Sequence, residues 1–281
     1  MWPFRKKNKK EDNSEKHSAE HAQLLKAIAP WKTKHMRQGW RPIAQIGTVE
    51  NYKCQFGGIP FVETGMSEAV CPLCGKAPPL FLQLDSRELP ESRRTFGDGL
   101  LQLYYCTSCE GDGEGWNAHS AVSQFRILRS RELHRANTPL DSIITPRTIV
   151  RWEPFEDYPS TDESEEMGVT IGYDFKNDLV NVECRELGLV MKGLSNHIND
   201  LDMEVAEAIS SAASGDKLGG WPHWIQSPEY PSCPECGSIM EHFFQIDSGD
   251  HLEYMFGDAG CGHITQCPKH RGRFAFGWAC C

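Results

Sequence analysis

This chain contains an internal repeat, and the repeat constrains the fold more than any other feature of the sequence. The string CPLCG at 71–75 returns as CPECG at 233–237. Three further signatures accompany both copies in the same order: a Gly-Gly-x-Pro turn, a strand-like run containing Gln-x-Asp, and a Phe-Gly-Asp turn. A repeat at a fixed period indicates one structural unit used more than once. The sequence therefore predicts two related halves.

Each copy carries four residues whose side chains zinc prefers. The first set is Cys71, Cys74, Cys106 and Cys109, and the second set is Cys233, Cys236, Cys267 and His270. Two residues separate the members of each pair, which lets one tight turn present both ligands to one ion. We therefore predict two zinc ions, each joining two turns that lie far apart in the sequence.

The fourth ligand of the second set has rivals, because Cys261, His263 and Cys280 each compete with His270. The alignment of the copies favours His270, since it falls where Cys109 falls in the first copy. A complete set of four ligands leaves no coordination position for a reacting water, so the predicted ions are structural rather than catalytic. A dithiol redox role is a weaker interpretation, because no βαβ unit surrounds the Cys-x-x-Cys pairs.

The hydrophobic pattern favours short strands over helices. Apolar residues alternate with polar ones around 80–85, 101–105, 240–246 and 274–278, which is typical of strands, whereas 200–213 has helical spacing. We predict an α+β fold rich in antiparallel sheet, with two pseudo-repeated halves that each hold a zinc-ribbon-like pair of knuckles. The expected organisation is a disordered basic tail at 1–18, an N-terminal helix at 19–40, a first repeat module at 41–130, an acidic unduplicated middle segment at 131–216, and a second repeat module at 217–281.

Charge and composition limit the classes of partner. The formal net charge is -10, with basic residues concentrated at 1–10 and acidic residues at 141–167. A folded nucleic-acid-binding domain normally shows a basic stripe, so this balance argues against a nucleic-acid partner and favours a basic protein partner or simple solubility. No apolar run is long enough to span a bilayer, and no secretory leader is visible, so we expect a cytoplasmic protein without a membrane partner.

Several motifs resemble the YwqG-like family, a bacterial domain of unknown function, over about residues 41–281. The matching strings are KCQFGGIP (Lys53–Pro60), PLFLQLD (Pro79–Asp85), FGDGLLQLYYC (Phe96–Cys106), KLGGWPHWIQSPEYPSCPECG (Lys217–Gly237), FFQID (Phe243–Asp247) and FGDAGCGHITQCPKH (Phe256–His270). That family is distantly similar to the programmed-cell-death-2 family of eukaryotes. The resemblance implies an adaptor or chaperone role, and also that metal is optional for the fold, since many members lack some knuckle cysteines.

We therefore expect a zinc-stabilised intracellular protein-binding module of adaptor, chaperone-like or immunity type, without catalytic activity. The aromatic and proline-rich segment GGWPHWIQSPEYP, with Trp221, Trp224 and Tyr230, is either a recognition surface or a lid over a small core. The alternatives are an RNA-processing hydrolase with a cleft lined by Asp98, Asp258 or unassigned histidines, and a nucleic-acid binder that uses its zinc ribbons. Phosphate-binding and dinucleotide-binding glycine motifs are absent from the sequence.

Overall fold

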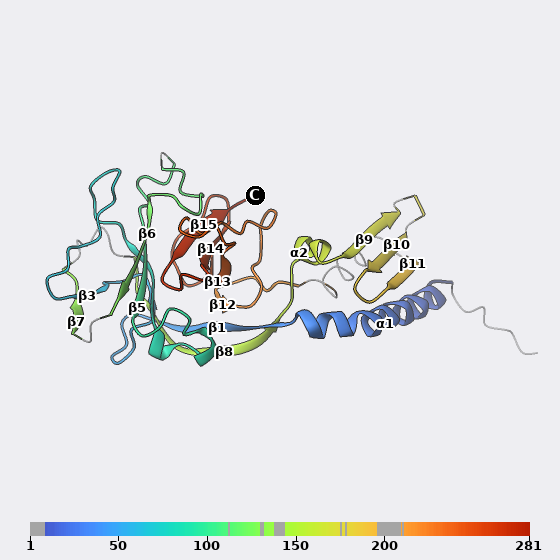
Figure 1. Ribbon diagram of the computed structural model, residues 1–281. Coiled ribbons are helices and arrows are strands. Elements are labelled where there is room, and N and C mark those ends of the chain that lie inside the picture. The colour runs from blue at the N-terminus through green and yellow to red at the C-terminus, as the bar shows by residue number, and fades with distance from the viewer. Residues whose placement is uncertain are drawn as a thin grey trace, which may run out of the picture. The chain divides into compact units, whose positions relative to one another are not determined.

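The computed structural model describes residues 9–111, 113–129, 132–137, 144–174, 176–177, 179–195, 209 and 211–281 (Figure 1). The chain forms two compact units, each built from two stretches of sequence. The smaller unit comprises Met1–Arg37 with Asp157–Ala212, and the larger unit comprises Gln38–Glu156 with Ala213–Cys281. The predicted middle segment at 131–216 is therefore divided between the two units rather than forming a part of its own.

The smaller unit consists of a long helix and a three-stranded antiparallel sheet. Its helices are α1 (Lys9–His35) and α2 (Thr161–Glu166), and its strands, in the order β11-β10-β9, are β9 (Val169–Asp174), β10 (Leu179–Cys184) and β11 (Leu189–Ser195). Leu24, Ile28 and Trp31 recur every three or four residues, so they share one face of α1. All three are fully buried, in one cluster with Val180 and Val182 of β10.

Helix α1 differs in its bounds from the helix predicted at 19–40. It begins at Lys9, within the segment predicted to be a disordered tail, and it continues through Pro30 to His35. Residues 9–18 include three lysines and two glutamates, which favour helices, and the packed face further along stabilises the whole element. The chain then enters a strand at Arg37. The helix predicted at 200–213 lies outside the described residues, apart from Ile209 and 211–213.

A ten-stranded sheet dominates the larger unit. In the order β15-β14-β13-β12-β1-β8-β2-β4-β5-β6, its strands are β15 (Phe274–Ala279), β14 (Cys261–Gln266), β13 (Glu241–Asp247), β12 (Lys217–Gly219), β1 (Arg37–Ile46), β8 (Arg147–Asp157), β2 (Gln55–Phe56), β4 (Leu80–Asp85), β5 (Leu100–Tyr105) and β6 (Ser123–Leu128). Strands β3 (Phe61–Glu63) and β7 (Leu133–Arg135) form a separate antiparallel pair, and two short 3-10 turns follow β4 at Ser86–Glu88 and Glu91–Arg93.

The sheet curls until its two edge strands meet. Phe125 of β6 stacks on Phe274 of β15, with ring centroids 5.5 Å apart. This closure encloses a core rich in aromatic rings, among them Phe81, Phe244 and Phe276, which are fully buried. The segment at 116–118 covers the backbone of β15, since the N–H groups of Phe276 and Trp278 donate to the carbonyls of Ala118 and Trp116, both at 3.1 Å. These edge groups are therefore not open to pairing with another chain.

The two ends of the sheet make matching hydrogen bonds. On β4, the amide of Gln83 accepts from the Phe61 backbone (3.0 Å) and donates to the Lys53 carbonyl (2.7 Å). On β13, the amide of Gln245 accepts from the His223 backbone (2.7 Å) and donates to the Gly215 carbonyl (2.8 Å). The pairing register also shifts at equivalent places: between Leu80 and Leu82 where β4 pairs with β5, and between His242 and Phe244 where β13 pairs with β14. A buried glutamine therefore pins a loop to the sheet at each end.

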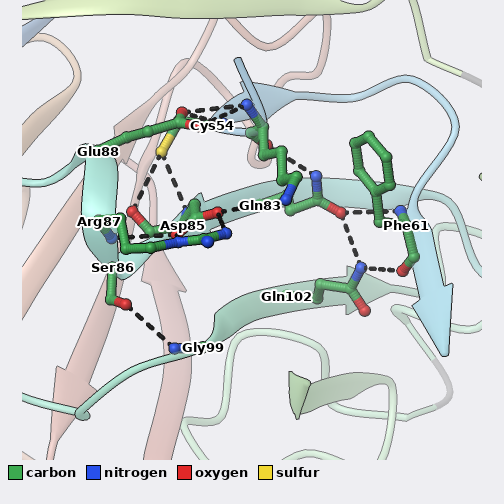
Figure 2. A network of polar contacts seen from close by, with 10 residues as sticks. Cys54, Phe61, Gln83, Asp85, Ser86, Arg87, Glu88, Gly99 and Gln102 are labelled. Atoms are coloured by element: carbon green, nitrogen blue, oxygen red, sulfur yellow. Dashed lines mark hydrogen bonds and ion pairs between the residues drawn. The ribbon is translucent and has the colours of Figure 1, made fainter. Parts of the chain in front are cut away.

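A polar network behind β4 extends this arrangement (Figure 2). Gln102 of β5 donates both to the Gln83 side chain (2.7 Å) and to the Phe61 carbonyl (2.6 Å). Glu88 accepts from the backbone N–H groups of Lys53 and Cys54 at 2.9–3.0 Å. Every one of these groups has a partner, so the network holds the loop before β2 without leaving an unpaired buried atom.

Candidate metal centres

The first group of cysteines lies where two turns meet at the ends of β4 and β5. Cys71 and Cys74 belong to the turn before β4, where the Gly75 N–H donates to the Cys71 carbonyl at 2.9 Å and Gly75 adopts φ 73°. That left-handed conformation favours glycine. Cys106 and Cys109 follow β5, and the sulfur atoms of all four cysteines lie within 4.8 Å of one another. Cys74 Sγ is 3.7 Å from Cys106 Sγ.

The second group has the same construction at the ends of β13 and β14. Gly237 adopts φ 67°, and its N–H donates to the Cys233 carbonyl at 2.8 Å. The ligand atoms of Cys233, Cys236, Cys267 and His270 lie within 4.8 Å of one another. Cys236 Sγ is 3.6 Å from Cys267 Sγ, and His270 Nδ1 is 3.8 Å from Cys233 Sγ.

These distances suit tetrahedral coordination. With a Zn–S bond of about 2.3 Å, sulfur ligands at the corners of a tetrahedron stand roughly 3.8 Å apart. Both groups could therefore hold a metal ion with little movement of the chain. Each has four ligand atoms, which is the number that a closed structural zinc site uses, whereas a catalytic site keeps one position open.

The structure places the rivals of His270 elsewhere. Cys261 is fully buried, and its thiol points to the Ile246 carbonyl at 3.5 Å. The ring of His263 packs against Trp224, with centroids 4.3 Å apart. Cys280 lies beside Gly257, away from the second group. His270 is the residue that the fold brings to the three cysteines, although its Nδ1 also lies 3.2 Å from Glu235 Oε2.

The thiols of each group titrate differently because their surroundings differ. A hydrogen bond from the Lys76 backbone lowers the pKa of Cys74 to about 7, and hydrogen bonds from Ser238 lower the pKa of Cys236 to about 6. Burial raises the pKa of Cys106 and of Cys233. Since a thiolate is the form that binds metal, Cys74 and Cys236 are ready to coordinate, and a cation would have to deprotonate the buried Cys106 and Cys233.

A third group of candidate ligands combines Asp216, Asp250 and His251. Asp216 is fully buried beside β12, where it accepts hydrogen bonds from the backbone of Asp247 (2.7 Å) and from His251 Nδ1 (2.8 Å). The Asp250 carboxylate accepts from the Asp216 backbone at 2.7 Å and lies 3.3 Å from His251 Nδ1. These carboxylates are occupied in fixing the loop before β12 to the turn after β13.

Burial and pairing shift the pKa values in this third group. Burial raises the pKa of Asp216 to about 6. Burial alone would lower the pKa of His251, but hydrogen bonds to Asp216 and Asp250 outweigh it and raise that pKa to about 9. The imidazole is therefore protonated at neutral pH and forms an ion pair. The motifs shared by the two copies do not predict this group. It lies where the copies differ, since Cys54 and Leu89 of the first copy align with Asp216 and His251 of the second.

Comparison with known families places this chain in an uncharacterised group. Residues 54–269 match a family described as a domain of unknown function, DUF1963, and the chain belongs to that family. The match covers the first cysteine group, the three cysteines of the second group and most of the ten-stranded sheet, and it ends one residue before His270. No curated protein matches the sequence. Among the described residues, no helix combines the length and apolar character that crossing a membrane requires.

Proposed function

We propose that this chain is an intracellular protein-binding module of adaptor, chaperone-like or immunity type, stabilised by two structural zinc ions and without catalytic activity of its own. The observation that carries the proposal is the pair of complete four-ligand groups, at Cys71/Cys74/Cys106/Cys109 and at Cys233/Cys236/Cys267/His270. A structural zinc ion contributes on the order of 10 kcal/mol of apparent binding free energy to folding at neutral pH. The two ends of the sheet would then be copies of one module, each with a zinc-ribbon-like pair of knuckles.

Exposed apolar side chains near the knuckles support a role in binding. Val70 and Leu73 are 52% and 53% exposed beside the first group, and Ile239 is 59% exposed beside the second. A closed metal site fixes the backbone that carries these side chains, so they can contact a partner without first being ordered. The net charge of -10 favours a basic protein as that partner.

The motif resemblance to the YwqG-like family, and through it to the programmed-cell-death-2 family, supports the same proposal. Adaptors and chaperones of newly made proteins need a rigid scaffold with exposed contact surfaces. The knuckles supply the scaffold here, and the apolar residues that flank them supply a surface of the required kind.

The hydrolase alternative calls for a cleft lined by Asp98, Asp258 or histidines. Both aspartates are exposed, and neither is among the residues that line the two cavities described below, although His263 lines one of them. A general base works best in a site that excludes water, and both aspartates lie open to solvent. The alternative of a nucleic-acid binder that uses its zinc ribbons lacks a specific observation in favour of the ribbons, and the acidic net charge opposes it.

The proposal can be tested by capturing partners of the tagged full-length protein from the cells that naturally make it, with identification by mass spectrometry. We expect a basic protein in roughly stoichiometric amount, lost after a strong chelator is added. The variant Cys281→Ser, at an exposed cysteine outside both groups, should capture the same protein. Recovery of no protein above the untagged background would contradict the proposal.

A further inference from the structure

A cavity of about 280 Å³ opens over β14 and β15, and two of its lining residues, Pro231 and Thr265, lie two positions before Cys233 and Cys267 of the second cysteine group. Its walls include Trp116, Trp224 and Trp278, and its floor includes His263 and Thr265 of β14 together with Gly277 of β15. All of these residues belong to the larger unit. The volume approaches the lower end of the range that small-molecule sites occupy, about 300–1,000 Å³.

Polar atoms in the walls and floor of this cavity lack hydrogen-bond partners. His263 and Thr265 are 5% and 2% exposed. Both ring nitrogens of His263, the Thr265 hydroxyl and the Trp224 indole N–H are buried without a partner in the part of the chain that the structure describes. Each such atom costs about 1–3 kcal/mol when nothing satisfies it. A set of this kind around one cavity points to a molecule that supplies the missing partners.

At the other end of the sheet, the protein's own side chains satisfy and fill the equivalent place. There the strand pair β4–β5 sets Gln102 opposite Gln83, as β13–β14 sets His263 opposite Gln245. Gln102 donates to the Gln83 side chain (Figure 2). It also accepts from the Tyr104 hydroxyl at 3.0 Å, so both of its polar groups are satisfied. The cavity beside Tyr104 measures only about 20 Å³.

The edge strands next to these positions, β6 and β15, also differ in how far their side chains fill the space. On β6, Arg126 pairs with Gln102 and extends over the Tyr104 ring, and its guanidinium donates to the Ser67 carbonyl at 2.8 Å. On β15, the corresponding partner of His263 is Gly277. A Cβ atom at Gly277 would lie 2.9 Å from the Trp116 carbonyl, so the segment that carries Trp116 can pack here because position 277 has no side chain. Small residues thus leave open at β14–β15 the space that large side chains fill at β5–β6.

The chemistry of the lining narrows the class of ligand. Burial, together with the nearby charge of Lys217, lowers the pKa of His263 to about 3, so its ring is neutral and offers one donor and one acceptor. Thr265 can donate or accept, and the Trp224 indole donates. No lysine or arginine is among the described lining residues, and Glu229 lies exposed beside the cavity, so a phosphate would find no basic partner. The tryptophan rings offer faces on which a flat ring can stack.

We propose that this cavity is a binding site for a neutral, planar heteroaromatic ring of the nucleobase class, which stacks on the tryptophans and pairs its polar edge with His263, Thr265 and Trp224. The base enters as a free base, as a nucleoside or on a single-stranded RNA. Because phosphate gains no contact there, the ring itself provides the affinity. This site is separate from the metal centres and does not depend on the proposed partner.

The test is isothermal titration of the zinc-loaded full-length protein with bases, nucleosides, nucleoside monophosphates and short single-stranded RNA. The decisive variant transfers the arrangement of the other end of the sheet, as His263→Gln combined with Thr265→Tyr. The matched control is Met255→Ala, which is 59% exposed in the same unit and does not line the cavity. We expect at least one base or nucleoside to bind with one site per chain, at least about tenfold more weakly to the double variant and unchanged in the control. The melting temperature of the double variant should equal or exceed that of the wild type, because the cavity is filled.

Trp224→Phe is a second variant, which removes the indole N–H donor but keeps an aromatic ring at this position. It should weaken binding, and it tests the site independently if the double variant does not fold. If RNA binds more tightly than any nucleoside, and the double variant loses that binding, the site is supported and its natural ligand is a base on an RNA strand. If a nucleoside or free base binds more tightly than RNA, the site is supported with a free small molecule as its ligand. No heat of binding for any base or nucleoside up to about 1 mM would overturn the proposal. Binding that the double variant leaves unchanged, or binding of N-acetyl-tyrosinamide or N-acetyl-tryptophanamide but of no base, would also overturn it.

Discussion

His251 shows how two opposing effects act on one imidazole. Burial disfavours its charge, but the hydrogen bond to Asp216 at 2.8 Å and the neighbouring Asp250 outweigh burial and raise its pKa to about 9. A pKa raised above its unfolded value stabilises the fold fully at pH values below the unfolded pKa near 6.5, and the stabilisation is lost as the pH rises through the folded pKa.

We predict that the His251 ring titrates near pH 9 in an NMR experiment, and that Asp216→Asn moves the midpoint towards 6.5. Over the same range, from about pH 6.5 to 9, the free energy of unfolding should fall by on the order of 2 kcal/mol. The raised pKa of Asp216 acts in the same direction at lower pH, from about 4 to 6. A midpoint near 6.5 in the wild-type protein would show that the ion pair does not form.

Cys74 allows a clean test of the first metal centre. Its side chain is exposed, so replacing its sulfur with an oxygen costs little unless the sulfur binds a metal ion. We predict that Cys74→Ser lowers the free energy of unfolding by at least about 2 kcal/mol in the presence of zinc, measured by urea denaturation. Cys281→Ser, also at an exposed cysteine, should change it by less than about 0.5 kcal/mol. Equal effects for the two variants would exclude a metal role for Cys74.

Helix α1 packs against the rest of the smaller unit through one of its faces. Ile28 is fully buried against the three-stranded sheet of the smaller unit, whereas Leu25 on the same helix is 38% exposed. We predict that Ile28→Ala destabilises this unit by about 2–4 kcal/mol, and that Leu25→Ala costs about 1 kcal/mol or less. Hydrogen exchange of the β9–β11 amides separates this effect from any change in the larger unit. Similar protection in both variants would mean that α1 does not stabilise that sheet.

Some elements could be predicted because their signals are local. Cysteines two residues apart, followed by Gly75 or Gly237, define a knuckle within a few residues, and the repeat predicted which pairs of knuckles belong together. The strands at 80–85 and 274–279 show alternating patterns for the same reason. The order of the strands could not be read in this way: β1 and β8 lie between the two repeated parts of the sheet, and nothing in their own residues specifies that place.

The sites that the sequence did not reveal depend on contacts across the sheet. Asp216 and His251 meet because β12 and β13 are antiparallel, which brings the loop before β12 beside the turn after β13. The cavity arises because His263 and Thr265 stand where Gln102 and Tyr104 stand at the other end, and the difference in side-chain volume matters only once both places are known. The motifs that the two copies share predict neither site, because both sites are formed by residues that differ between the copies.

For the molecule as a whole, we propose that the duplicated cysteines form the scaffold, with a zinc ion in each four-ligand group, and that the unduplicated residues form the contact surfaces and the cavity. The most direct measurement is the metal content of the full-length protein, purified without chelator and analysed by inductively coupled plasma mass spectrometry. We predict two zinc ions per chain, falling to one in a Cys236→Ser variant. Wild-type protein that contains no zinc would contradict the proposed zinc scaffold.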